Sequence, residues 1–191
     1  KKIDGLHNSD LIIIAGRPSM GKTAFATNIA FNIAMALEKR KKKQESDLRG
    51  KVLFFSLEMS SEQLATRILS ESSEVSSQKI RSGDISKLEY GKIVKSSETI
   101  SDLSLFIDDS PALTISSIRT RARRLKRKHG LDLIMIDYLQ LIESNSKNLN
   151  DNRVKEVSDI TRGLKALAKE LNIPVIALSQ LSRKVEDREE K

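Results

Sequence analysis

A strand-length apolar run that leads straight into a glycine-framed loop constrains the fold of this chain more than any other feature. Residues 11–15 are Leu-Ile-Ile-Ile-Ala, and residues 16–23 follow the pattern Gly-x-x-x-x-Gly-Lys-Thr before a helical pattern begins. Gly16 and Gly21 allow tight backbone angles and a close approach that a Cβ would block. The N–H groups of such a loop point into one concavity at the start of a helix. The segment therefore predicts a phosphate-binding P-loop rather than a strand-to-helix turn that binds nothing.

The side chains of this loop predict how a nucleoside triphosphate would be held. Lys22 can reach the β- and γ-phosphates, and the hydroxyl of Thr23 can ligate Mg²⁺. We therefore expect ATP and Mg²⁺ as cofactors, with Lys22 as a catalytic residue as well as a binding one. The residues predicted to bind the nucleotide are Gly16, Arg17, Pro18, Ser19, Met20, Gly21, Lys22, Thr23 and Ala24.

The composition limits the partners and the location that we expect. The 191 residues fit one domain, 1–191, and carry a net charge of +8, which favours a polyanionic partner. Aromatic residues make up 4% and tryptophan is absent, so base stacking is not expected to be the main binding device. With no cysteine and two histidines, neither a disulfide nor a zinc site is expected. The apolar runs are strand-length and residues 1–10 lack a signal-peptide core, which predicts a cytoplasmic chain without a membrane partner.

Strand-length apolar runs alternate with helical patterns along the chain. The apolar period after the P-loop continues to about Lys39, and two capping-box patterns, Ser60 with Gln63 and Ser86 with Glu89, open further helices. This alternation predicts an α/β fold with a mostly parallel sheet flanked by helices on both faces. The strands are expected at 11–15, 52–57, 103–107, 131–136 and 175–178, and two more helices at 114–128 and 153–172.

Two carboxylates follow predicted strands, at the ends where parallel sheets bind ligands. Asp137 comes after the apolar run 133–136, which is the Walker B arrangement, and can hold Mg²⁺ together with Thr23. The alternative is a strand-terminal Asp in a turn. Glu58 follows the run 52–57 and is the candidate general base that polarises the attacking water. The competing interpretation is that Glu58 caps the next helix, although Ser60 and Gln63 already supply a cap.

Other polar residues also stand at strand ends. Gln180 follows the run 175–178, and its amide can both donate and accept hydrogen bonds. We expect it to act in catalysis by sensing the γ-phosphate and passing its presence to the next segment; the alternative is a plain polar strand end. Asp108 and Asp109 precede Ser110 and Pro111 in a natural turn opening, so we expect both aspartates to be structural.

Three basic stretches have two interpretations each. The run 39–47 is interpreted mainly as a solvated helix end and exposed loop, with nucleic-acid contact as the alternative. For the basic faces of the helices expected at 114–128 and 153–172, contact with a phosphate backbone and plain solvation remain equally open. Arg153 is the most interesting of these cations, because it lies near the strand ends.

Four motifs occur together at residues 16–23, 55–60, 136–141 and 177–181, with the sequences GRPSMGKT, FSLEMS, IDYLQL and ALSQL. In combination they resemble the successive motifs of the bacterial replicative DNA helicases of the DnaB family. The resemblance covers nearly the whole chain and implies a RecA-like P-loop ATPase domain that works as a homohexameric ring around single-stranded DNA. It also implies 5′–3′ polarity, and a primase and a helicase loader as partners.

The resemblance assigns roles to residues of this sequence. It implies that Lys22, Thr23 and Asp137 bind Mg-ATP, that Glu58 activates water, and that Gln180 couples the nucleotide to loops that face DNA. Those loops would be the stretch 144–153 and the segment after Gln180.

The pattern of the family extends beyond the matched region. Members carry an N-terminal helical domain and a linker before it, and a later motif that supplies an arginine finger to the neighbouring subunit. Neither Arg183 nor Arg188 is assigned that role. Such an arginine raises turnover by on the order of 10³–10⁵-fold, so the resemblance implies that residues 1–191 alone bind nucleotide yet hydrolyse it poorly.

A helicase motor is therefore the leading hypothesis, and three others compete with it. A P-loop kinase needs an acceptor pocket, and usually a lid of arginines, rather than a water-activating Glu58. A recombinase-type or clock-type RecA relative would share the nucleotide site and differ in the shape of its oligomer. A non-enzymatic DNA-binding module is hard to reconcile with a complete Mg-nucleotide site.

Overall fold

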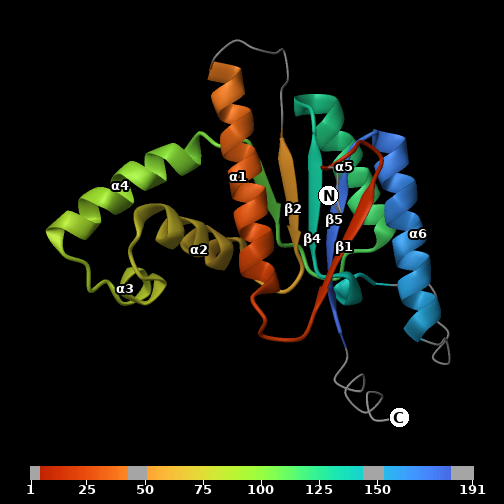
Figure 1. Ribbon diagram of the computed structural model, residues 1–191, viewed down its shortest axis with the longest axis horizontal. Helices are drawn as coiled ribbons and strands as arrows, with labels where there is room; N and C mark the ends of the chain where they lie inside the picture. Colours follow the sequence, from red (N-terminus) through yellow and green to blue (C-terminus); the bar gives the residue numbers. More distant parts are fainter. Residues whose placement is uncertain (1–4, 43–50, 144–152, 182–191) are drawn as a thin grey trace.

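A sheet of parallel strands forms the centre of the molecule (Figure 1). The computed structural model describes residues 5–42, 51–143 and 153–181. The strand order is β1-β5-β4-β2-β3 and every pairing is parallel, which confirms the five expected strands and the parallel sheet. The strands are β1 (Leu11–Gly16), β2 (Val52–Ser56), β3 (Leu105–Asp108), β4 (Leu133–Asp137) and β5 (Val175–Gln180).

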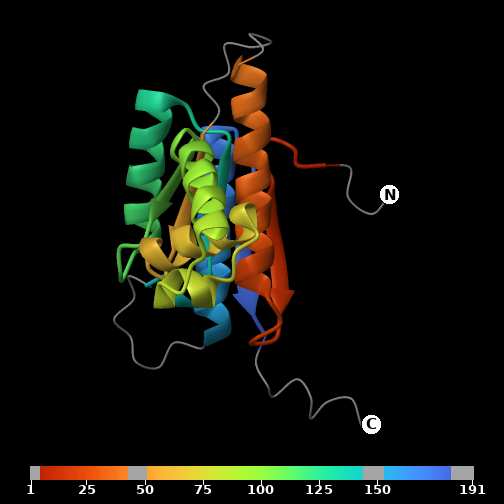
Figure 2. The same ribbon diagram turned by 90° about the vertical axis from the view of Figure 1, so that its left-hand side faces the viewer.

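Helices cover both faces of the sheet, as the alternating pattern predicts. Figures 1 and 2 show α1 on one face and α5 on the other, with the strands between them. Within the described ranges, no helix is long and apolar enough to cross a membrane. The helices are α1 (Lys22–Lys42), α2 (Ser61–Ser73), α3 (Ser77–Ser82), α4 (Lys87–Ser101), α5 (Ile115–His129), the 3₁₀ helix η1 (Leu139–Leu141) and α6 (Arg153–Leu171).

Alternate residues of the central strands enter two separate hydrophobic layers. In β2, Val52 and Phe54 pack in the layer that contains Ala30 of α1, whereas Leu53 and Phe55 pack in the layer that holds α5 and α6. All five residues of β2 are buried, and the same is true of β4. Because both faces are covered, these strands appear in the sequence as continuous apolar runs rather than as alternating ones.

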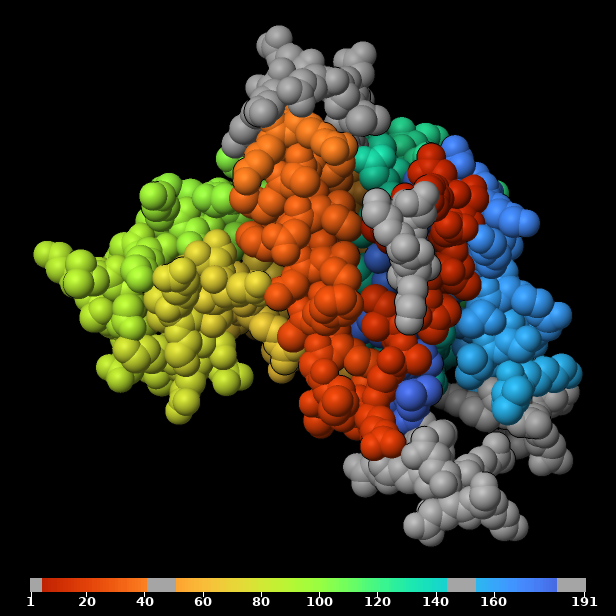
Figure 3. Space-filling view, viewed as in Figure 1, coloured from red at the N-terminus to blue at the C-terminus, as the bar shows by residue number. Residues whose placement is uncertain are grey.

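The helices α1 and α3 differ from the expected pattern, and the 3₁₀ helix η1 was not expected either. α1 runs three residues past Lys39 to Lys42, because lysine and arginine are good helix formers and extend the basic end. α3 was not expected, since its six residues are too few for an apolar period; its N-cap Ser76 accepts a hydrogen bond from Gln78 N at 3.2 Å. Figure 3 shows α2, α3 and α4 gathered into a lobe beside α1. The predicted capping boxes at Ser60 and Ser86 are both present.

Gly163 allows α6 to approach α5 closely. A Cβ on this residue would lie 2.9 Å from Cγ2 of Ile115, the first residue of α5. The β-branched side chain of Ile115 is stiff and cannot easily turn away. Gly91 in α4 offers a contrast, because a Cβ there would meet no atom within 4 Å. Only one of these two helical glycines is therefore required by packing.

We expect Gly163→Ala to lower the free energy of unfolding by about 1–3 kcal/mol, because overpacking against Ile115 exceeds the gain in helix propensity. The matched variant Gly91→Ala should raise it by about 0.5–1 kcal/mol, since alanine meets nothing there and favours the helix. Chemical unfolding followed by circular dichroism measures both changes. Equal shifts for the two variants would contradict the close packing of α6 on α5.

Candidate functional site

The backbone of the loop between β1 and α1 makes the left-handed turns that a phosphate cradle requires. Ser19 and Gly21 have φ angles of 61° and 79°, in the left-handed region. Lys22 Nζ donates a hydrogen bond of 2.6 Å to the carbonyl of Arg17, so its side chain folds back over the loop. A Cβ on Gly16 would lie 3.2 Å from both Cγ and Cδ of Lys22. A side chain at position 16 would therefore crowd the lysine that has to reach the phosphates.

The loop opens into a cleft of about 460 Å³ at the carboxyl ends of the strands. The structure brings Lys22, Glu58 and Gln180 together there, although they come from three different parts of the sequence. Three residues of the predicted nucleotide set, Gly16, Arg17 and Met20, belong to the loop but not to the lining, and Met20 is 73% exposed. The lining residues are Pro18, Ser19, Gly21, Lys22, Thr23, Ala24, Glu58, Met59, Arg67, Tyr138 and Gln180.

Asp137 lies at the end of β4 with a side chain that is almost fully buried. Its Oδ2 has no hydrogen-bond partner among the described residues. Burial raises the pKa of the carboxyl, and the charge of Glu58 adds to this, while a hydrogen bond with Thr23 and the charges of Lys22 and Arg67 act to lower the pKa. A buried carboxylate oxygen without a donor, close to a threonine hydroxyl, is the kind of oxygen pair that suits a hard cation.

Glu58 stands just past the end of β2 with an exposed side chain that lines the cleft. The cap of α2 is made by Ser60, whose Oγ accepts from Gln63 N at 3.3 Å while Ser60 N donates to Gln63 Oε1 at 3.1 Å. The interpretation of Glu58 as a helix cap is therefore wrong. Ser56 Oγ donates to Met59 O at 2.6 Å and fixes the turn that carries Glu58.

The side-chain amide of Gln140 forms hydrogen bonds with both the N–H and the C=O of Gln180. Gln180 N donates to Gln140 Oε1 at 3.2 Å, and Gln140 Nε2 donates to Gln180 O at 3.0 Å. Gln140 also donates to Ser179 Oγ at 3.0 Å. These hydrogen bonds fix the backbone at the end of β5, where Gln180 lines the cleft. Sequence reasoning included Gln140 in a motif but gave it no role, because a glutamine in a 3₁₀ helix carries no pattern that names its partners.

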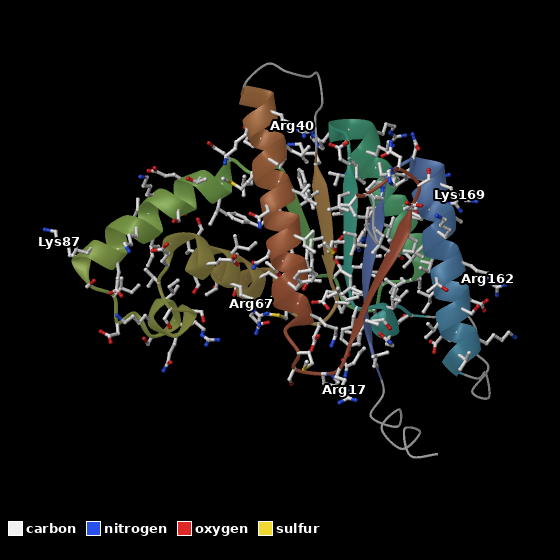
Figure 4. All side chains as sticks on the ribbon, viewed as in Figure 1. Arg17, Arg40, Arg67, Lys87, Arg162 and Lys169 are labelled. Carbon is white, nitrogen blue, oxygen red and sulfur yellow. The ribbon has the colours of Figure 1, made fainter. Side chains whose placement is uncertain are left out.

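Arg67 and Tyr138 also line the cleft and were not predicted as site residues. Figure 4 shows Arg67 on α2 beside the start of α1. A weak sequence signal existed, since Arg67 lies between the buried Leu64 and Ile68 and is thus near the packed side of the helix. Tyr138 directly follows Asp137 and could have been found by that position alone.

Asp108 and Asp109 have structural roles, as predicted. Asp108 accepts hydrogen bonds from Arg121 Nη1 at 2.7 and 2.6 Å, and from Ser110 N. Partial burial acts to raise the pKa of Asp108, but these bonds lower it more. Asp109 Oδ2 accepts a hydrogen bond of 2.7 Å from Ser61 N, which lowers the pKa of Asp109. The stretch 144–152 and the segment 182–191, proposed as DNA-facing loops, lie outside the described residues, as does the side chain of Arg153.

We expect Asp137→Asn to raise the free energy of unfolding at pH 7, measured without nucleotide or Mg²⁺, because it removes a buried charge. The pKa of Asp137 is above its ordinary 3.8 in the folded chain, so folding takes up protons between the two values. The stability cost is fully present above the folded pKa and disappears as the pH falls toward 3.8. Urea unfolding at pH 7 measures the expected gain in stability, and unfolding at about pH 4 measures its expected loss. The exposed Asp84→Asn is the control. A variant that is no more stable than the parent at pH 7 would contradict this interpretation of the burial.

Comparisons with known proteins agree with this geometry. The profile of the DnaB-like helicase C-terminal domain matches residues 1–191. The chain is 59% identical over 190 residues to the replicative DNA helicase DnaB of Rickettsia typhi, which covers 100% of this chain and 38% of that protein. It is 48% identical over 187 residues to DnaB of Geobacillus stearothermophilus, which covers 98% of this chain and 38% of that protein. The chain thus spans about two fifths of the length of these relatives.

Solved structures share the fold. One of them, described as an ATPase domain, superposes with a TM-score of 0.81 at 36% identity, covering 96% of this chain and 61% of that one. A DnaB-like replicative helicase, described with its interactions with primase, gives the same TM-score and identity and covers 96% of this chain and 42% of that one. These likenesses confirm the predicted α/β, RecA-like ATPase fold. Together with the match along the full chain, they show that this chain belongs to the DnaB-like helicase C-terminal domain family.

Proposed function

We propose that this chain is the ATP-hydrolysing motor part of a replicative DNA helicase. The observation that carries the proposal is the cleft that unites Lys22, Glu58 and Gln180; the buried Asp137 is not in its lining but interacts with the lining residue Thr23. Hydrolysis coupled to movement needs a phosphate cradle, a base and a residue that connects the cleft to the rest of the chain. The names of the two relatives described above, replicative DNA helicases at 59% and 48% identity, support the same activity.

In this proposal the P-loop binds ATP, and Mg²⁺ is held by Thr23 of the loop together with Asp137. Apart from Pro18, which has no N–H, the predicted set from Gly16 to Ala24 supplies backbone N–H groups, and Lys22 exchanges its bond with the Arg17 carbonyl for the β- and γ-phosphates. Thr23 and Asp137 would hold Mg²⁺, which when bound draws negative charge from the phosphate oxygens. The orphaned Oδ2 of Asp137 fits this role, because a cation would supply the partner that the described residues do not.

Glu58 is proposed as the general base. It lies at the mouth of the cleft, where its carboxylate can accept a proton from a water molecule while the water oxygen attacks the γ-phosphorus. The bond from the γ-phosphorus to the bridging oxygen then breaks, and ADP leaves with that oxygen. Because Ser60 rather than Glu58 caps α2, the carboxylate is available for this work.

Gln180 is proposed to report the state of the γ-phosphate. Gln140 fixes the backbone of Gln180 by hydrogen bonds. A change at the γ-phosphate would therefore move the side chain of Gln180 and not the end of β5. We propose single-stranded DNA as the partner that responds, and a homohexameric ring with 5′–3′ polarity as the assembly.

Further partners follow from the family. A solved relative is described by its interactions with primase, and we propose primase and a helicase loader as partners of this chain as well. The extent of the domain, 1–191, and the cytoplasmic location remain predictions. The recombinase-type and clock-type alternatives are not favoured, because the matched relatives are replicative helicases.

The base is tested by Glu58→Gln in a chimera in which this chain replaces the 187 matched residues of the Geobacillus stearothermophilus relative. We expect single-stranded DNA to stimulate phosphate release by the parent chimera, and Glu58→Gln to slow release by about 10²–10⁴-fold with little change in nucleotide affinity. The control is Glu62→Gln, an exposed carboxylate on the first turn of α2 that is outside the lining. Full turnover by Glu58→Gln would overturn the assignment, and phosphate transferred to an acceptor other than water would indicate a kinase.

Arg67 is tested by nucleotide binding. Arg67 lines the same cleft as the P-loop residues, so we expect its guanidinium to contact the phosphates by charge-assisted hydrogen bonds. Arg67→Gln should weaken binding of a fluorescent ATP analogue by about tenfold, whereas Arg81→Gln, an exposed arginine on α3, should have no effect. The role in nucleotide binding is refuted by an unchanged dissociation constant for Arg67→Gln.

A further inference from the structure

A second cleft, of about 520 Å³, lies between the edge strand β3 and α5 and shares no lining residue with the nucleotide cleft. Figure 2 shows α5 and β3 next to each other on the side of the molecule that faces the viewer. Its lining includes Phe106, Ile107, Arg121, Arg124, Leu125 and Lys128. Two carboxylates also line it, but Asp108 is paired with Arg121, and Asp109 accepts a hydrogen bond from Ser61 N.

The outer edge of β3 offers free hydrogen-bonding groups to this cleft. β3 is the last strand of the sheet, and in the described part of the chain it pairs only with β2. Val52 N donates to Ser104 O at 2.9 Å, so the backbone groups of Ser104 and Phe106 are directed at β2. Successive residues of a strand alternate in this direction, which turns the N–H and C=O groups of Leu105 and Ile107 toward the open edge. An exposed strand edge of this kind can receive another strand.

The floor of the cleft is apolar and fixed in position. Phe106 is 37% exposed, and its ring stacks on His129 at 6.1 Å between centroids. Lys51 Nζ lies 5.5 Å from the centroid of the same ring and donates to Ser104 Oγ at 2.8 Å. These contacts hold Phe106 as a firm apolar surface beside the strand edge.

One wall of the cleft is positively charged. Arg121, Arg124 and Lys128 are spaced at three and four residues along α5, so they share one face of the helix. Arg121 is occupied by Asp108 and Ser110. Arg124 and Lys128 have no ion-pair or hydrogen-bond partner in the ranges that the structure describes, and their side chains are exposed. Within those ranges, two unpaired cations therefore stand beside a free strand edge.

We propose that this cleft binds an extended acidic segment of a partner protein, which adds as a further strand to β3. Backbone groups of the segment pair with Leu105 and Ile107, and its carboxylates pair with Arg124 and Lys128 on the α5 face of the sheet. Its alternate apolar side chains point to the opposite face, where the side chains of Leu105 and Ile107 pack. Alternation of acidic and apolar residues is what an added strand needs to face the α5 cations on one side and this apolar layer on the other. A nucleic-acid strand would satisfy the cations but would leave the amide groups of the β3 edge without partners.

The test uses the 191-residue chain and a fluorescein-labelled short peptide in which Glu and Asp alternate with Val, followed by fluorescence anisotropy. We expect micromolar binding that the double variant Arg124→Glu, Lys128→Glu weakens at least tenfold. The matched control is Lys87→Glu, Lys169→Glu, which reverses two exposed lysines at distant places on α4 and α6 (Figure 4) and should leave binding within about twofold. Asp109 is left unchanged in all variants, because it holds Ser61 at the start of α2.

Two further arms use the unaltered chain, so they do not depend on how a variant folds. Peptide N-methylated at alternate amides should lose at least tenfold in affinity, because it cannot pair with β3. Oligothymidylate should not displace the parent peptide. The proposal is overturned if the peptide does not bind, if both double variants bind it equally, if the N-methylated peptide binds like the parent, or if oligothymidylate displaces it and thereby marks a nucleic-acid surface.

Discussion

The parallel register of the sheet determines where the candidate site residues lie. Gly16 is opposite Gln180 across β1 and β5, and Ser56 is opposite Asp137 across β2 and β4. The chain therefore leaves these strands at one edge, where the P-loop and Glu58 join them. A slip of one residue in β4 would exchange its two faces and turn its apolar side chains into the wrong layer. The site depends on this backbone pairing as much as on its own side chains.

The sequence predicted what local patterns encode and missed what packing alone creates. The strand-loop-helix order around residues 16–23, the buried strands and the caps at Ser60 and Ser86 all follow from short-range spacing, and the structure confirms them. Phosphate binding by the loop stays a prediction. Arg67 could not be recognised with certainty, because it enters the cleft through the packing of α2 beside α1. Gln140 was missed for the same reason, since its hydrogen-bond partners lie 39 and 40 positions away.

The end of the edge strand and the nucleotide cleft share one framework. Asp109, in the turn after β3, binds the first N–H of α2 at Ser61, and the cap at Ser60 holds the same turn from within. Glu58 precedes this point and Arg67 follows it on the helix. The positions of Glu58 and Arg67 thus depend on the start of α2. This start is fixed by its own cap at Ser60 and by the hydrogen bond from Ser61 N to Asp109 after β3.

The burial of Asp137 has a consequence for how sequences of this kind change with time. A carboxylate with an unsatisfied oxygen in the interior makes the resting fold less stable, whereas a neutral side chain of similar shape would not. Random drift that is checked only by the need to fold would therefore remove this charge early. If Asp137 holds Mg²⁺ as proposed, that role is what keeps an aspartate at this position, and its loss in a diverged copy would go with loss of the site.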